Sequence, residues 1–154
     1  MTTNTERQPA SQPRREPRHR AREAAIQMLY QWEVGRTSID EVVRTFWTHG
    51  LGREPLSEPH RQLAADLASG VVASVESLDS LIANAAEHWR IERMAVIDRL
   101  ILRLAVYEFL HRQDTPARVV INEALELART FSTDDAVRFI NGILDGIRRS
   151  PERE

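Results

Sequence analysis

Five residues near the start of the chain carry, or can carry, a positive charge: Arg15, Arg18, His19, Arg20 and Arg22. The guanidinium group of arginine is planar and permanently charged, so it can donate paired hydrogen bonds to a phosphate and stack on a base. The spacing of Arg18 and Arg22 puts both on one face of a helix. The cluster therefore predicts a phosphate-binding arm, although a solubilising tail or surface ion pairs would also explain it.

The charges are distributed unevenly along the chain of 154 residues. All 21 basic residues are arginine, and six of them lie in residues 1–22 beside only two glutamates. This segment carries a charge of +4, whereas the remainder carries −6 within the net charge of −2. A basic arm on an acidic body favours a polyanionic partner.

A second candidate surface lies near the end of the chain, where Phe139 follows Arg138 and Gly142 and Gly146 fall on the next turns. An aromatic ring beside an arginine can stack an unpaired base. Because glycine within a helix costs about 1 kcal/mol relative to alanine, Gly142 suggests that a ligand or another backbone approaches closely. The simpler alternative is that Phe139 packs against a neighbouring helix.

The sequence contains no recognisable catalytic or metal-binding motif. Its five histidines are scattered, without the H-E-x-x-H spacing of zinc enzymes, and there is no cysteine. The pair Asp134 and Asp135 opens a predicted helix, where carboxylates complement the helix dipole. We therefore expect no enzymatic activity, no cofactor and no metal site. The lack of cysteine, of a signal peptide and of a long apolar run predicts a cytoplasmic protein without a membrane span.

Apolar residues recur at helical spacing, and no segment alternates as a strand would. The pattern predicts an all-α fold of about six or seven helices, preceded by a disordered polar and basic tail at residues 1–16. Gly35 should end the first helix, Ser38 should cap the second, and a long helical region should follow at 58–89 with a break near Gly70 or Ser77. The segment 96–110 is apolar nearly all round and predicts a central, buried helix.

Two further helices are predicted after the central one, each with a start signal. Thr115 should cap the first of them, with Pro116 in its first turn. Ser132 and Asp135 resemble a capping box that opens the last helix.

Four segments of the sequence resemble, in order and in spacing, the NusB family of bacterial transcription antitermination factors. They are RHRAREAAIQMLYQW (18–32), LRLAVYE (102–108), VINEALELA (120–128) and RFINGILD (138–145). The resemblance covers about residues 18–147. It implies a helical RNA-binding domain at 17–150, made of two small packed subdomains at roughly 17–90 and 91–150.

The resemblance also implies a function without catalysis. NusB-like proteins bind the single-stranded boxA segment of ribosomal RNA leader transcripts together with NusE, a small-subunit ribosomal protein, and help RNA polymerase to read through termination signals. The family's RNA-contacting positions correspond to Arg18, His19, Arg20, Arg22, Phe131, Asp135 and Phe139. Its NusE-contacting positions correspond to Tyr30 and Asp98.

This chain departs from the family pattern at two positions. His19 stands where arginine is usual, so we expect its contribution to depend on pH and to be weaker at neutrality. Ser132 replaces a common glycine, so the turn before the last helix should differ.

Three alternative functions stay open at the level of sequence. The chain could be a detached RNA-binding module like that of some ribosomal RNA cytosine methyltransferases. Residues 115–147 could form a helix-turn-helix for duplex DNA. A purely structural helical oligomer is the third alternative, and the sequence leaves open whether the protein is a monomer or a homodimer that covers its own RNA surface.

Overall fold

The structure, a computed structural model, describes residues 16–48, 55–87 and 91–150. Within these ranges the chain forms seven α-helices and one short 3₁₀ helix, and no residue is in a strand. The predicted all-α fold is thus confirmed. The elements are α1 (Pro17–Gly35), α2 (Ile39–Thr45), α3 (Glu58–Ala73), α4 (Val75–Ala86), η1 (Ile91–Arg93), α5 (Val96–His111), α6 (Ala117–Phe131) and α7 (Asp134–Arg149).

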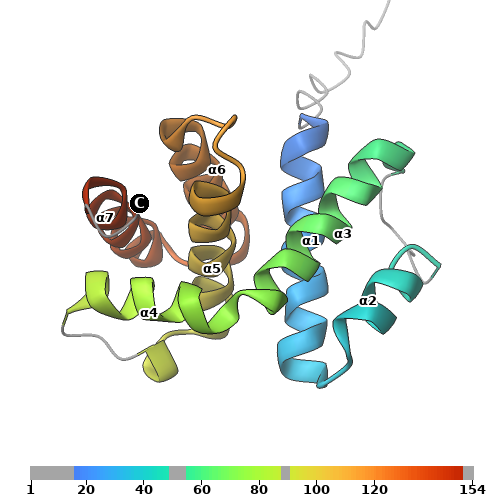
Figure 1. Cartoon of the computed structure of the whole chain (residues 1–154), viewed down its shortest axis with the longest axis horizontal. Helices are drawn as coiled ribbons and strands as arrows, with labels where there is room; N and C mark the ends of the chain where they lie inside the picture. Colours follow the sequence, from blue (N-terminus) through green and yellow to red (C-terminus); the bar gives the residue numbers. More distant parts are fainter. Residues whose placement is uncertain (1–15, 49–54, 88–90, 151–154) are drawn as a thin grey trace, which may run out of the picture.

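Helix α5 is the central element, as its apolar sequence predicted. It packs against α1, α3, α4, α6 and α7, and most of its residues are buried. Figure 1 shows α1, α2 and α3 gathered on one side of the molecule, with α4 to α7 on the other. The fold therefore consists of two groups of helices that meet along α1, α3 and α5.

The chain passes from the first group of helices to the second at Ser74. The amide of Ser74 donates to the carbonyls of Gly70 and Val71, which ends α3, and α4 leaves in a new direction. Leu78 and Ile82 of α4 are fully buried, and α4 packs on α5 and α7. Helix α4 therefore belongs with the second group, and the break expected near Gly70 or Ser77 falls between these two positions, at Ser74.

A close approach between α3 and α5 depends on a glycine. A β-carbon at Gly70 would lie only 2.2 Å from the ring and hydroxyl of Tyr107. The Tyr107 ring thus occupies the space above Gly70, so this glycine is required by packing against the central helix.

The helix ends follow the predicted signals in part. The Ser38 hydroxyl accepts a hydrogen bond from the Glu41 amide at 3.4 Å, which confirms its role as the cap of α2. The cap of α7 is Thr133, whose hydroxyl accepts from the Ala136 amide at 3.1 Å, and not Ser132 as predicted. Ser132 instead donates its hydroxyl proton to Asp98.

The starts and ends of the other helices differ slightly from the prediction. Helix α6 begins at Ala117, with Pro116 in the capping position and without the side-chain cap expected from Thr115. Gly35 is the last residue of α1, but the left-handed conformation that ends the helix falls on Arg36, with φ of 53°. The predicted tail lies outside the described residues except for Glu16. Among the described helices, none has the length and apolar character needed to cross a membrane.

Candidate nucleic-acid interface

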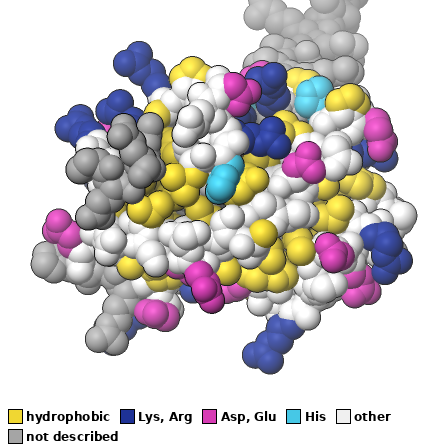
Figure 2. Space-filling model, viewed as in Figure 1, with side chains coloured by type: hydrophobic (Ala, Val, Ile, Leu, Met, Phe, Trp, Pro, Cys, Tyr) yellow, Lys and Arg dark blue, Asp and Glu magenta, His cyan; other side chains and the backbone are white. Residues whose placement is uncertain are grey.

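The basic cluster lies in the first two turns of α1, but its members divide between the surface and the interior. Arg18 is exposed, and Arg20 is half-exposed with its Nη2 donating to the carbonyl of Pro55 at 2.8 Å. His19 and Arg22 are buried. In Figure 2, arginine and histidine side chains gather at the end of the molecule where α1 begins, with acidic side chains between them.

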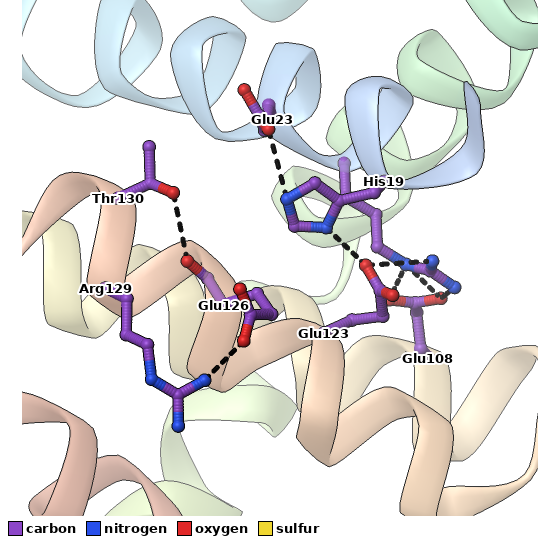
Figure 3. A network of polar contacts seen from close by, with 8 residues as sticks. His19, Glu23, Glu108, Glu123, Glu126, Arg129 and Thr130 are labelled. Atoms are coloured by element: carbon purple, nitrogen blue, oxygen red, sulfur yellow. Dashed lines mark hydrogen bonds and ion pairs between the residues drawn. The ribbon is translucent and has the colours of Figure 1, made fainter. Parts of the chain in front are cut away.

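The buried His19 is held between two glutamates (Figure 3). Its Nδ1 contacts a carboxylate oxygen of Glu123 from α6, and its Nε2 lies 3.0 Å from Oε1 of Glu23. These hydrogen bonds outweigh the effect of burial and raise the pKa of His19 to about 9. Both neighbouring carboxylates thus stabilise the imidazolium and favour a charged His19 at neutrality, which the sequence alone did not indicate.

Arg22 forms an ion pair in the interior between α1 and α5. Its Nε and Nη2 donate to both carboxylate oxygens of Glu108 at 2.9–3.2 Å, and its Nη1 lies 3.6 Å from Glu123. Arg22 and Glu108 are each less than 10% exposed. The prediction that Arg22 belongs to a surface arm is thus corrected, since its guanidinium group is already occupied by carboxylates.

The sequence held a signal for this ion pair. Glu108 interrupts the apolar central helix, and a charge in such a place needs a buried partner. Arg22 lies one turn before the fully buried Ile26 on α1. Arg103 is a second charge in the same central helix, and its Nε and Nη2 donate to both oxygens of Asp79 on α4 at 2.7 and 2.8 Å. Sequence reasoning missed both pairs.

The second predicted RNA surface lies on α6 and α7. Phe131 and Phe139 are half-buried and pack against the core, whereas Asp135 is exposed in the first turn of α7. Gly142 and Gly146 are exposed, and a β-carbon at either position would meet no described atom within 4 Å. No described part of the chain therefore makes the close approach expected at Gly142, and this strip of α7 is open.

The two predicted partner-binding residues lie on helices that are joined by an ion pair. Tyr30 of α1 is 43% exposed. Glu33, three residues later on α1, accepts a hydrogen bond at 2.6 Å from Arg99, which follows Asp98 on α5. The structure thus brings the α1 turn of Tyr30 to the α5 turn of Asp98.

The described residues include no group of three or more histidine, aspartate or glutamate side chains that could hold a metal ion. Asp134 and Asp135 lie in the first turn of α7, where their charges complement the helix dipole.

The model of the NusB family matches residues 19–149 of the chain. The chain belongs to this family. A transcription antitermination protein NusB from Koribacter versatilis (strain Ellin345) is 47% identical over 137 residues, which are 89% of this chain and 92% of the relative. The family match thus covers nearly the whole of the described structure.

Solved structures of NusB proteins share the fold. NusB of T. maritima aligns with a TM-score of 0.78 and 32% identity over 90% of this chain and 96% of its own. A chain from a complex of the antitermination factors NusB and NusE with double-stranded RNA aligns with a TM-score of 0.73 over 85% of this chain and 95% of its own. At 23% identity, the latter likeness supports the fold alone.

Proposed function

We propose that this NusB-family protein is an RNA-binding transcription antitermination factor that binds boxA RNA of ribosomal RNA leader transcripts together with NusE. The observation that carries the proposal is the family match over residues 19–149, together with the 47% identical antitermination protein. The NusB family is non-enzymatic. The protein then works by assembling a complex in the cytoplasm that lets RNA polymerase read through termination signals.

Arg18 and Arg20 supply the phosphate contacts in this proposal. Both lie in the first two turns of α1 and reach the surface, and their guanidinium groups fit phosphate oxygens. His19 and Arg22 lie beneath this surface and stabilise it. Their ion pairs with Glu123 and Glu108 fix the start of α1 against α6 and α5.

The bases of the RNA would lie on the α6–α7 side. The half-buried rings of Phe131 and Phe139 pack against the core and are partly accessible for stacking. Asp135 has an exposed carboxylate that can accept hydrogen bonds from base amino groups. The open strip at Gly142 leaves room for a strand to lie close to α7. Unpaired bases are the preferred target of such sites because they can stack and expose their edges.

NusE would bind at the end of the molecule where Tyr30 and Asp98 lie. The exposed ring of Tyr30 is the type of residue that anchors protein interfaces.

A homodimer that covers the RNA surface would compete with RNA, and RNA would then shift the equilibrium toward the monomer. Sedimentation with and without RNA measures that shift.

The deciding experiment compares binding of a boxA-type single strand with a scrambled strand of equal composition, with and without NusE, at two salt concentrations. Selective binding that NusE strengthens supports the proposal. Equal, salt-sensitive binding to both strands means that the arginines act as a generic arm. A duplex DNA of matched length is included, because preference for it would favour the helix-turn-helix alternative.

A further inference from the structure

One hydrogen bond joins the α6–α7 turn to the start of α5. The Ser132 hydroxyl donates to Oδ1 of Asp98 at 2.6 Å, and both residues are half-buried. Ser132 ends α6, with its amide donating to the carbonyl of Ala128 at 2.8 Å, while Asp98 lies in the first turn of α5. The bond therefore connects residues 34 positions apart at the ends of two helices.

On one side of this bond lies the turn that carries the proposed RNA-binding residues. Phe131 directly precedes Ser132, and Asp135 follows it in the first turn of α7. The next residue, Thr133, caps α7 through its contact with the Ala136 amide. The Ser132–Asp98 bond therefore fixes the residue that directly precedes the cap of α7.

On the other side lies the proposed NusE-binding end. Asp98 is followed by Arg99, whose Nη2 donates to Oε1 of Glu33 at 2.6 Å. Glu33 lies one turn from Tyr30 on α1. Covalent neighbours and two short polar contacts thus form a continuous path from the turn of Tyr30, through the start of α5, to the start of α7.

We propose that Ser132 is a positioning residue that couples NusE binding at Asp98 and Tyr30 to RNA binding at the start of α7. This inference rests on the proposed function. A partner that orders the first turn of α5 also orders the α6–α7 turn through the Ser132–Asp98 bond, and a preordered turn binds RNA at a lower entropic cost. Glycine at this position has no hydroxyl and could not form this link.

The test measures the factor by which NusE strengthens binding of a boxA-type strand to the full-length protein. Ser132→Ala and Ser132→Gly remove the hydroxyl, and Ser132→Thr retains it. Ser80→Ala is the matched control, because it removes a hydroxyl that bonds within its own helix, to the carbonyl of Glu76 at 3.1 Å on α4. Circular dichroism and thermal unfolding establish that each variant is folded.

We expect the strengthening by NusE to fall about fivefold in Ser132→Ala and Ser132→Gly, the lower end of typical couplings between sites. Binding of RNA alone should change less than about twofold, and Ser132→Thr and Ser80→Ala should keep the original factor. An unchanged factor in Ser132→Ala, or an equal loss in Ser80→Ala, overturns the inference alone. Absence of any strengthening in the unsubstituted protein contradicts the proposed function and the inference together.

Discussion

Arg22 and Glu108 share two parallel hydrogen bonds in the interior between α1 and α5, with the Arg22 Nε and Nη2 facing the two carboxylate oxygens at 2.9–3.0 Å. Each residue is almost wholly removed from solvent. A pair of this kind is costly to break from one side, because the remaining charge stays buried without its partner. This buried ion pair, together with the His19–Glu123 and Arg99–Glu33 contacts, holds α1 in a fixed position against α5 and α6.

Arg22→Ala should destabilise the fold by about 3 kcal/mol, because it leaves the Glu108 carboxylate buried without its partner. Urea unfolding followed by circular dichroism measures this change. Arg18→Ala is the matched control on the same helix and should change the stability by less than about 0.5 kcal/mol, since Arg18 is exposed. If both variants were equally stable, the Arg22–Glu108 pair would have no structural role.

Arg18→Ala should instead weaken RNA binding and reduce its salt dependence. Loss of one phosphate contact lowers the slope of log affinity against log salt by about 0.7 for a single strand. Arg93→Ala, at the end of η1, is a control that removes an exposed arginine from outside the proposed surface. Equal slopes for Arg18→Ala and the unsubstituted protein would show that this arginine does not contact phosphate.

Much of the fold could be predicted from the sequence, because apolar residues at helical spacing and cap residues such as Ser38 act locally. The sequence predicted a break near Gly70 or Ser77, but the direction of α4 could not be predicted, because it depends on the packing of Leu78 and Ile82 against distant helices. The basic cluster of α1 likewise depends on contacts with residues that are distant in the sequence. Its composition predicted a charged arm, but which arginine turns inward depends on Glu108, which lies 86 residues away.

The His19–Glu123 contact should make stability depend on pH. The folded-state pKa of His19 is about 9, above its ordinary value of 6.5. Protonated His19 therefore stabilises the fold fully below pH 6.5, and this contribution is lost as pH rises through 9. The loss amounts to at most about 3 kcal/mol. Glu123, whose pKa is lowered chiefly by its hydrogen bond to His19, contributes above its ordinary range and loses its effect in acid.

Urea unfolding between pH 6 and pH 9.5 measures this loss, and His19→Arg is the informative variant. Arginine stays charged over the whole range, so the decline between pH 6.5 and 9 should largely disappear. A decline of the same size in His19→Arg would assign the pH dependence to another group.

Gly70→Ala should destabilise the protein, because the added methyl group would meet the ring of Tyr107 at 2.2 Å. The ring must then leave its place between α3 and α5, which we expect to cost about 1–3 kcal/mol. In a Tyr107→Ala background, the effect of Gly70→Ala on the free energy of unfolding should have the opposite sign. There the space above residue 70 is vacant, and alanine should gain up to about 1 kcal/mol over glycine from its helix propensity. A double-mutant cycle of the free energy of unfolding compares the two backgrounds. Destabilisation of equal size in both would show that the Tyr107 ring does not impose glycine at residue 70.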